Sequence, residues 1–542
     1  MLSFSMPPKL TRRPRESAAT KRVAAKAAAR AEATSKRLAA EQGRANRAAV
    51  RRAARRRKRT PIYQPSGPRL PLPSAAAPPV TTPVTPQPAP AATPPPAADP
   101  LVYSGAFGPE QAERLLWRAG FGPRPGEAEQ VAALGLREAV RRLVEPGPAT
   151  LTGPEPRVGT TALAPRDLDG HDHLWWLDRM VRSSNQLSER LALVFHDWFA
   201  TTNADVNQRP LMLDQNELFR ARWLGSFDEL VSAVTTDPAM LVFLDGIANR
   251  TGRPNENYAR ELLELFTLGA DRGAYTETDI REAARALTGW RADYVSGTGY
   301  QNFRFDMARF DATPKTIFGE RGAFGWADVV RLALENPSHR SFFVLKLWSA
   351  FVPSPPDAAT QAALEARYVA SGRSIRAIVE AILLHPDLYG PRRMVKPPAV
   401  FAAGLLRALG TGIITSAWVG ACAGAGQRLF YPPNVSGWND AAWLDTSTLA
   451  SRWLLVAEAV KPLTVKDNTG YSDTESPEAA LEAARAFWAR PRLSPESLDV
   501  LGRFAATTLP ATTGTTAAAN ARGQRQNALR HLVAAAPDGQ TS

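Results

Sequence analysis

From residue 105 onward, apolar side chains recur every three to four residues, and patterns with strict alternation are scarce. This spacing gathers apolar side chains on one face of a helix, which is buried by packing against other helices. Only residues 300–310 alternate aromatic and polar side chains, which predicts a small β-hairpin. The sequence therefore predicts an all-α body of many helices with at most a minor sheet. The expected helices cover residues 110–119, 174–181, 187–199, 211–223, 227–235, 255–269, 276–290, 326–335, 340–351, 358–370, 375–384, 398–409, 446–460, 477–489, 495–508 and 524–535.

Positive charge is confined to an N-terminal arm. The chain has a net charge of +14, but residues 1–60 hold 19 Lys and Arg against 3 Glu, whereas residues 61–542 hold 47 against 49 acidic residues. The arm has too few leucines and valines for a core-facing stripe, so we expect it to be disordered or transiently helical. Such arms bind nucleic acid or other polyanions, including anionic lipid surfaces. A solubilising tail, or an extension from an upstream start codon, is the alternative.

Residues 61–104 are expected to link the arm to the body. Within residues 61–100, 15 of the 40 residues are proline, and only Arg69 and Asp99 are charged. Proline-rich segments are extended and semi-rigid, at about 3.1 Å per residue in polyproline geometry. The predicted organisation is therefore an arm (1–60), a linker (61–104) and a helical body (105–542).

Targeting and redox signals are weak in this sequence. No apolar run has the length of a signal peptide or a membrane span, and the pair Arg12-Arg13 has no hydrophobic region behind it. The single cysteine, Cys422, excludes an internal disulfide framework and a zinc cluster. We therefore expect a cytoplasmic protein with no transmembrane segment.

The helix predicted at 255–269 carries an unusual acidic face. Asn255 is its expected N-cap and Gly269 its stop signal. At 100° per residue, the polar side chains fall within an arc of roughly 140°, opposite an apolar stripe. The face consists of Glu256, Asn257, Arg260, Glu261 and Glu264.

Two interpretations of this face remain open. Its i,i+4 pairs are what a solvated, salt-bridged helix surface needs. Alternatively, the face lines a pocket in which Arg260 holds one carboxylate ionised and crowding raises the pKa of another. In that case Glu261 and Glu264 are the acid/base candidates.

A second helix is expected to begin at Thr276, in a capping box closed by Asp279, and to lead to Trp290. Asp271, Asp279 and Glu282 have offsets found in calcium loops, but acids are missing at the other offsets, so we reject that interpretation. A tight helical hairpin accounts better for residues 255–290.

Two further features carry candidate residues. His196 lies on a Trp- and Phe-rich helix, where it is either functional or a buried structural histidine. The segment 432–443 holds two prolines, Asn434, Trp438 and Trp443, and is expected to be a rigid loop. Such loops carry binding sites, and Trp faces suit flat apolar ligands or sugars. The alternative is that the tryptophans plug the core between helical layers.

Metal and nucleotide motifs give little support for a particular reaction. The His171–His173 region with its neighbouring aspartates is better explained as a solvated acidic turn than as a cation site. No G-x-S-x-G elbow, phosphate-cradling glycine loop, dinucleotide fingerprint or H-E-x-x-H occurs. The sequence indicates no metal site and no particular cofactor.

Several blocks together resemble the bacterial family called "domain of unknown function 1800", in its actinobacterial type. The blocks lie at residues 112–122, 174–177, 188–199, 255–290, 315–319, 396–397 and 426–438. The resemblance covers about residues 106–540 and implies no established reaction. Family members often have Trp where Phe195 stands and His where Trp198 and Phe310 stand. These departures count against a metal site.

Two classes of function follow. In the first, the body is an enzyme or ligand-binding domain with an acidic pocket on the hairpin. Its catalytic candidates are Glu256, Arg260, Glu261, Glu264 and His196, and its ligand-binding candidates are Asn257, Arg285, Trp290, Lys315, Asn434 and Trp438. In the second, the body is a scaffold that the basic arm tethers to nucleic acid or another polyanion.

Overall fold

A computed structural model describes residues 99–465, 475–507 and 515–542 of the chain. The arm at 1–60 and nearly all of the proline-rich linker lie outside these described residues. The predictions made for them therefore stay predictions.

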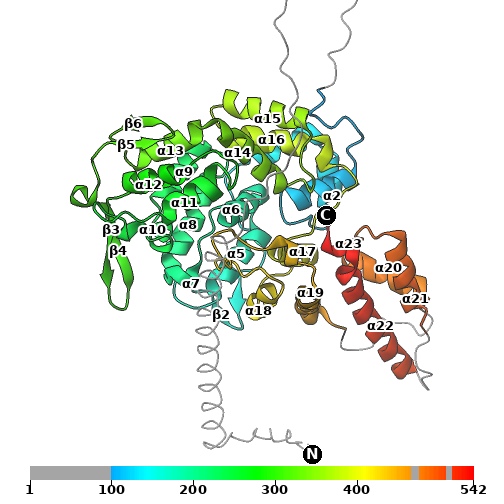
Figure 1. The fold of residues 1–542 in the computed structure, drawn as a ribbon. Helices are drawn as coiled ribbons and strands as arrows, with labels where there is room; N and C mark the ends of the chain where they lie inside the picture. The colour runs from blue at the N-terminus through cyan, green and yellow to red at the C-terminus, as the bar shows by residue number, and fades with distance from the viewer. Residues whose placement is uncertain (1–98, 466–474, 508–514) are drawn as a thin grey trace, which may run out of the picture. The chain divides into compact units, whose positions relative to one another are not determined.

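The described residues form a body dominated by helices, as the apolar spacing predicts (Figure 1). The helices of its first half are α2 (Pro109–Arg118), α3 (Glu127–Ala132), α4 (Leu136–Val144), α5 (His171–Arg182), α6 (Gln186–Trp198), α7 (Asn203–Val206), α8 (Arg209–Ala221), α9 (Phe227–Thr235), α10 (Pro238–Phe243), α11 (Asn257–Glu261) and α12 (Glu277–Ala286). Those of its second half are α13 (Trp326–Glu335), α14 (Pro337–Ser349), α15 (Ala358–Ala370), α16 (Ile375–Leu384), α17 (Pro398–Leu409), α18 (Ala417–Gly424), α19 (Thr446–Val460), α20 (Pro477–Phe487), α21 (Pro495–Ala505), α22 (Thr515–Ala535) and α23 (Pro537–Gln540).

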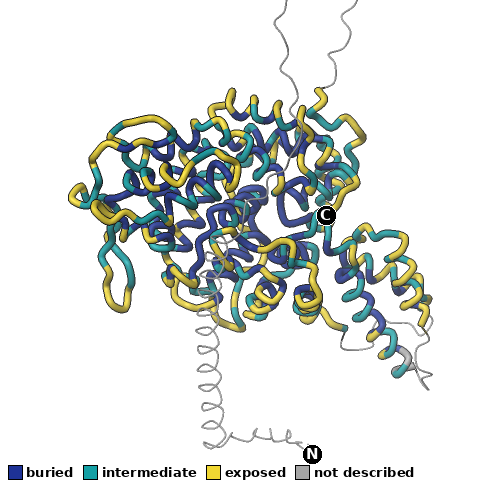
Figure 2. The backbone as a smooth tube through the Cα atoms, in the orientation of Figure 1, coloured by how far each residue is buried: buried dark blue, intermediate teal, exposed yellow. Residues whose placement is uncertain are grey.

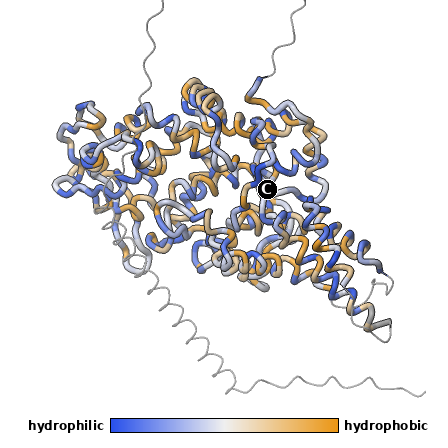
Figure 3. The backbone as a smooth tube through the Cα atoms, turned by 45° about the vertical axis from the view of Figure 1, so that its right-hand side comes forward, coloured by the Kyte–Doolittle hydropathy of each residue, from blue (hydrophilic) through white to orange (hydrophobic). Residues whose placement is uncertain are grey.

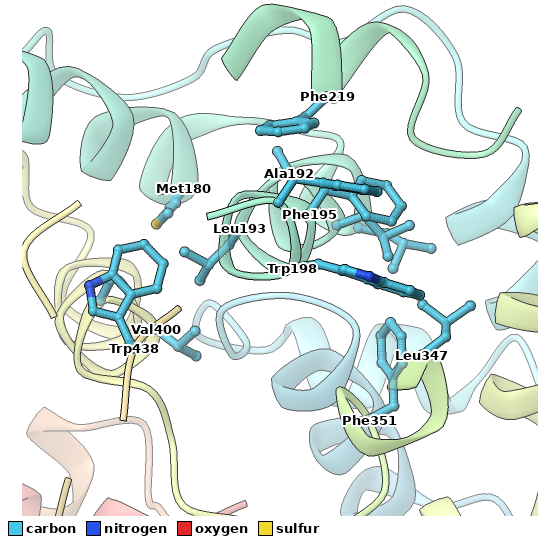
Figure 4. Packing of buried hydrophobic residues seen from close by; sticks show 14 of the residues in the cluster. Met180, Ala192, Leu193, Phe195, Trp198, Phe219, Leu347, Phe351, Val400 and Trp438 are labelled. Carbon is cyan, nitrogen blue, oxygen red and sulfur yellow. The ribbon is translucent and has the colours of Figure 1, made fainter. Parts of the chain in front are cut away.

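Helix α6 lies in the centre of the core. Every residue of α6 except Val194 and Asp197 is buried, because neighbouring helices cover it on several sides. Its aromatic residues Phe195 and Trp198 belong to one large hydrophobic cluster, part of which is drawn in Figure 4. Figure 2 shows the buried stretches concentrated in the middle of the body, with the loops exposed. Hydrophobic and hydrophilic residues alternate along most helices in Figure 3, as amphipathic helices require.

In the part of the chain that the structure describes, strands are few and occur in three antiparallel pairs. Strand β1 (Arg157–Val158) pairs with β2 (Thr161–Ala162), and β5 (Lys315–Ile317) pairs with β6 (Glu320–Gly322). The longest pair joins β3 (Trp290–Val295) to β4 (Gly299–Phe305), with Trp290 opposite Phe305. This hairpin confirms the strand signal at 300–310 but begins earlier, and residues Met307–Arg309 form a 3₁₀ turn, η3, instead of a strand.

The last helices are attached to the body through the segment before α17. The backbone of Met394 exchanges two hydrogen bonds with Ser542, both 2.9 Å long, and Val395 forms a β-bridge with Thr541. Helix α22 also packs against α19 and α20. These contacts bring residues about 150 positions apart in sequence next to each other. Among the helices that the structure describes, none combines the length and the apolar character needed to cross a membrane.

Candidate functional site

The hairpin at 255–290 forms, but its first helix is not regular. Helix α11 ends at Glu261 and continues as a π-helical segment, η2 (Leu262–Thr267), in which the Thr267 hydroxyl donates to the carbonyl of Leu262 at 2.6 Å. The expected N-cap is displaced by one residue: Glu256 occupies the cap position, and the Asn255 side chain accepts from the backbone N–H of Asn257 at 2.9 Å. π-Helical turns are rare and are often found at functional sites.

The second half of the hairpin agrees with the sequence. Thr276 caps α12, its hydroxyl accepts from the backbone N–H of Asp279, and the Asp279 carboxylate accepts from the backbone N–H of Thr276. The predicted capping box is therefore confirmed. Gly269, with φ of +88°, ends the first helix in the left-handed conformation expected of a stop signal.

The acidic face of this hairpin is an ion-pair network centred on Arg260. Its guanidinium lies 3.2 Å from the carboxylate of Glu256, 3.3 Å from that of Glu264 and 2.8 Å from that of Glu277 on α12. These side chains are partly or largely exposed, and Glu261 beside them is half-buried. The arrangement favours the salt-bridged surface over an acidic pocket, because each of the three carboxylates already contacts the arginine.

A polar cavity of about 730 Å³ opens beside the N-terminal end of this network. Its walls are formed by the segment before α11 and by the end of η3. The β3–β4 hairpin precedes η3 and returns the chain to the segment before α11. The lining residues are Asp245, Ala248, Arg250, Arg253, Pro254, Asn255, Glu256 and Arg309. Of the catalytic and ligand-binding candidates expected from sequence, Glu256 alone lines this cavity.

The backbone around the cavity is held by specific contacts. Arg250 and Arg253 form a β-bridge that closes a tight turn, and the backbone N–H of Thr251 donates to the carbonyl of Arg309 at 2.7 Å. The Asn249 side chain accepts from the backbone N–H of Asn255 at 2.9 Å. These bonds fix segments that lie about 60 residues apart in sequence against each other.

Positive charge dominates the cavity wall. Among the described residues, no carboxylate lies within ion-pair distance of Arg250, Arg253 or Arg309. Arg309 donates to the carbonyl of Ile247 at 2.8 Å, but its buried Nε has no partner in the described part of the chain. Burial lowers the pKa of Arg309, and the positive charges of Arg291 and Arg250 lower it further.

The two carboxylates on the cavity wall are engaged elsewhere. Asp245 accepts from the Asn257 amide at 2.8 Å, which gives Asn257 a positioning role at the rim. Glu256 accepts from Arg260 at 3.2 Å. The cavity wall therefore carries three arginines that have no anionic partner among the described residues. Guanidinium groups bind phosphate, sulfate or carboxylate.

Arg285 and Lys315 lie together on a different face of α12. Arg285 donates to Asp311 at 2.8 Å and to Glu282 at 2.8 and 2.9 Å, and the Lys315 ammonium donates to the carbonyls of Asp311 and Thr313. Burial would raise the pKa of Asp311, but hydrogen bonds from Arg285 and Thr313 lower it to about 2. Burial lowers the pKa of Lys315. These contacts hold the segment before β5 against α12. Neither Arg285 nor Lys315 lines the cavity that carries Arg250, Arg253 and Arg309, called the arginine-lined cavity below.

The remaining ligand-binding candidates do not line the arginine-lined cavity. Trp290 begins β3 and packs edge-on against Phe305, with ring centroids 5.5 Å apart. Asn434 is exposed and accepts from the backbone N–H of Ser436 at 2.8 Å within its own loop. Trp438 is buried in the hydrophobic cluster of Figure 4, and its backbone N–H donates to Asp197 at 2.8 Å. The loop geometry favours the interpretation that Trp438 plugs the core.

His196 is fully buried in an aromatic box. Its ring centroid lies 5.3 Å from that of Trp176 and 5.6 Å from those of Phe430 and Trp438. Neither ring nitrogen has a hydrogen-bond partner in the described residues, and burial lowers the pKa of His196 to about 3. The histidine is therefore neutral at physiological pH, and its core position separates it from the hairpin candidates.

The aspartate and histidine side chains near 171 are tied to other parts of the body. Asp169 accepts from Arg209 at 3.1 Å and from Arg428 at 2.8 Å, and the buried His173 accepts from the backbone N–H of Leu429 at 3.0 Å. In the described part of the chain, no three His, Cys, Asp or Glu side chains converge as metal ligands do.

Sequence reasoning missed the three arginines of the cavity. Arg250 and Arg253 precede the signature helix in the letters Arg-Thr-Gly-Arg-Pro, but Arg309 lies far downstream. The local pair of basic residues was a weak signal, and only the β3–β4 hairpin shows that a third arginine joins it.

The comparisons with known proteins identify the family. Residues 114–540 match the model of the family described as "Protein of unknown function (DUF1800)". Because this match spans most of the chain, the chain belongs to that family. No curated protein and no solved structure matches the chain.

Proposed function

We propose that this member of a family of unknown function is a ligand-binding protein whose helical body holds a small anionic ligand in the arginine-lined cavity. The observation that carries the proposal is the set of three guanidinium groups, Arg250, Arg253 and Arg309, that face one cavity without carboxylate partners in the described residues. Guanidinium groups bind phosphate, sulfate and carboxylate through paired, charge-assisted hydrogen bonds.

Electrostatics support this choice over an acidic pocket. Unpaired arginines that repel each other gain stability from an anion between them, and the lowered pKa of Arg309 reflects burial and that repulsion. The cavity wall also carries two carboxylates, Asp245 and Glu256, so its three arginines leave an excess of one positive charge. Glu256 contacts Arg260 as well, but it shares this arginine with Glu264 and Glu277. In this account Arg260 and Glu264 position Glu256 and do not react with a ligand.

The direct test is calorimetric titration of the protein with inorganic phosphate and with sulfate at about 0.1 M ionic strength. We expect measurable binding that the double variant Arg250→Gln/Arg253→Gln weakens by at least about tenfold, since each charge-assisted hydrogen bond is worth about 1.5–3 kcal/mol. Both arginines are exposed, so the variant is expected to fold.

The matched control is Arg137→Gln, which removes an exposed arginine from α4, outside the cavity. We expect the loss of its positive charge to leave specific binding nearly unchanged, because Arg137 does not line the cavity and salt at 0.1 M screens exposed charges more than about 10 Å apart. Equal weakening in the control and the cavity variant contradicts a specific site.

The basic arm favours a second, separate function. Its 19 Lys and Arg against 3 Glu within 60 residues are suited to nucleic acid or another polyanion. Binding to duplex DNA is expected to weaken steeply with salt and to vanish in a variant lacking residues 1–100. Salt-independent binding, or binding that survives the deletion, excludes the arm as the tether.

A further inference from the structure

The arginine-lined cavity is larger than an inorganic anion requires. Its volume of about 730 Å³ falls in the range of about 300–1,000 Å³ that is usual for sites of small organic molecules. A bare phosphate ion would fill a small part of this space. A ligand that matches the whole wall therefore carries other groups beside its anionic one.

Two carboxylate oxygens of the wall are not engaged by the protein. Asp245 accepts from the Asn257 amide through Oδ2, and Glu256 accepts from Arg260 through Oε2. In the described part of the chain, neither Oδ1 of Asp245 nor Oε1 of Glu256 accepts a hydrogen bond. Because an ionised carboxylate accepts hydrogen bonds and donates none, a ligand group that meets these oxygens must be a donor.

Local hydrogen bonds bring the carboxylates close to one of the arginines. Nη2 of Arg309 donates to the carbonyl of Ile247 at 2.8 Å, and Ile247 is two residues along the chain from Asp245. Two residues span at most about 7 Å, so the Arg309 guanidinium lies near the backbone of Asp245. The 2.8 Å bond from Asn257 to Asp245 in turn places Asp245 beside Glu256, the residue before Asn257.

Charges of opposite sign thus share this wall without forming ion pairs. Among the described residues, no carboxylate lies within ion-pair distance of Arg250, Arg253 or Arg309. A ligand in the cavity meets guanidinium donors and carboxylate acceptors together. The wall therefore fits a molecule that combines an anionic group with hydrogen-bond donors.

The composition of the wall restricts the rest of the ligand. Its apolar members are Ala248 and Pro254, and none of the lining residues that the structure describes is aromatic. Nucleobases are commonly bound by stacking on aromatic side chains, so this wall is poorly suited to a nucleotide. The excess of one positive charge favours hydroxyl donors over ammonium donors, because an ammonium group would cancel negative charge on the ligand.

We propose that the ligand of this cavity is a small polyol phosphate, a phosphate monoester whose carbon chain carries hydroxyl groups. The proposal rests on the proposed function, since it assigns the phosphate group to Arg250, Arg253 and Arg309. It adds that hydroxyl groups of the same molecule donate to Asp245 and Glu256. The two carboxylates, which weaken the binding of a bare phosphate, thereby select a hydroxylated ester.

The test compares glycerol 3-phosphate with propyl phosphate, which has the same carbon chain and phosphate but lacks the hydroxyl groups. Calorimetric titration of the full chain at about 0.1 M ionic strength is the measurement. We expect glycerol 3-phosphate to bind at least about tenfold more tightly, because one hydrogen bond to a charged group is worth about that factor. The aminoethyl ester of phosphate, which carries an ammonium group, is expected to bind more weakly than glycerol 3-phosphate.

The variant Asp245→Asn is expected to change the two kinds of binding in opposite directions. Asparagine keeps a carbonyl oxygen for the bond from Asn257 and tolerates the left-handed backbone at this position, where φ is +59°. The preference for glycerol 3-phosphate over propyl phosphate should fall at least about threefold, because a charged acceptor becomes neutral. Inorganic phosphate should bind more tightly, because a carboxylate that repels it is gone.

The matched control is Asp499→Asn, which alters an exposed aspartate of α21 outside the cavity and should leave both kinds of binding nearly unchanged. Failure of this inference is distinct from failure of the proposed function. If the Arg250→Gln/Arg253→Gln variant weakens phosphate binding but glycerol 3-phosphate has no advantage over propyl phosphate, the polyol assignment is wrong and the anion site stands. Tighter binding of the aminoethyl ester, or a preference that Asp245→Asn leaves unchanged, also overturns the polyol assignment. If neither phosphate nor any of the esters binds, both proposals are wrong.

Discussion

The guanidinium of Arg260 reaches across the hairpin to the carboxylate of Glu277, with Nη1 and Nη2 donating at 2.9 and 2.8 Å. This bidentate pair joins α11 to α12, and Arg260 also contacts Glu256 and Glu264 within its own helix. One arginine therefore organises three carboxylates, which explains how a face so rich in acid remains stable. The network is structural, and the ligand site that we propose begins where it ends, at Glu256.

Replacing this arginine is expected to cost modest stability. Arg260→Met should lower the free energy of unfolding by about 1–2 kcal/mol, because exposed ion pairs contribute about 0.2–1 kcal/mol each and three are lost. Urea unfolding at low and high salt measures the loss, which is expected to shrink at 1 M salt. Arg503→Met, which breaks the single exposed pair with Asp499, is the control and should cost less than about 0.5 kcal/mol.

The same pair fixes the sign of the pH dependence. The hydrogen bond from Arg260 lowers the pKa of Glu277. A lowered carboxyl pKa stabilises the folded state above the unfolded pKa of about 4.3, and that stability is lost as the pH falls through the folded pKa. The difference between the Arg260→Met variant and the unaltered protein should therefore narrow below about pH 4. A difference that stays constant to pH 3 would exclude the ion pairs as its source.

His196 is expected to act on stability in acid and not on chemistry. Its folded pKa is about 3, against about 6.5 in an unfolded chain, so the unfolded state binds a proton that the folded state does not. The free energy of unfolding should fall by up to about 1.4 kcal/mol per pH unit from this residue as the pH drops below 6.5. His196→Phe should remove this contribution to the pH dependence of the free energy of unfolding, which urea unfolding at pH 7.5 and at pH 5 measures.

At neutral pH the His196→Phe variant should stay within about 1 kcal/mol of the unaltered protein, because its neighbours are aromatic and the lost ring nitrogens have no partners in the described residues. An unchanged acid slope would contradict the buried, neutral state of this histidine.

The substitution Gly404→Ala tests the packing around Trp117, whose ring centroid lies 3.6 Å from the ammonium nitrogen of Lys396. Within a helix, Gly→Ala normally stabilises by about 1 kcal/mol. In α17 the added methyl would collide with the Trp117 ring, so Gly404→Ala should instead destabilise by about 1–3 kcal/mol. Gly420→Ala in α18, where a Cβ meets nothing within 4 Å, is the matched control and should stabilise. Thermal unfolding of both variants shows whether each substitution raises or lowers stability. A stabilised Gly404→Ala variant would contradict the close contact between Gly404 and the Trp117 ring.

The local spacing of apolar residues was enough to predict the class of fold and the positions of most helices. Helices α9, α13, α15, α16, α17 and α19 begin and end where the apolar spacing predicts. Short helices such as α3, α7 and α10 were not predicted, since four to six residues give too little periodicity. The π-helical segment at Leu262–Thr267 also escaped prediction. Its apolar spacing matches an α-helix, and only the backbone hydrogen bonds distinguish the two.

The candidate site was predicted less well than the fold. Sequence reasoning found the acidic face but could not tell a surface network from a pocket, because the partner Glu277 lies on another helix. The arginine-lined cavity depends on Arg309, which lies far along the chain from Arg250 and Arg253. In the same way, the packing of α2 places Trp117 beside Lys396. Both arrangements depend on packing between residues far apart in the sequence, which the local spacing of apolar residues does not predict.

Location of a bound anion tests the central claim most directly. Crystals of the protein grown with arsenate, a phosphate analogue whose arsenic scatters anomalously, would show where the anion sits. The account predicts an anomalous peak in the 730 Å³ cavity, within hydrogen-bond distance of Arg250, Arg253 and Arg309. An empty cavity at arsenate concentrations that saturate binding in solution, or a peak only elsewhere on the body, would contradict it.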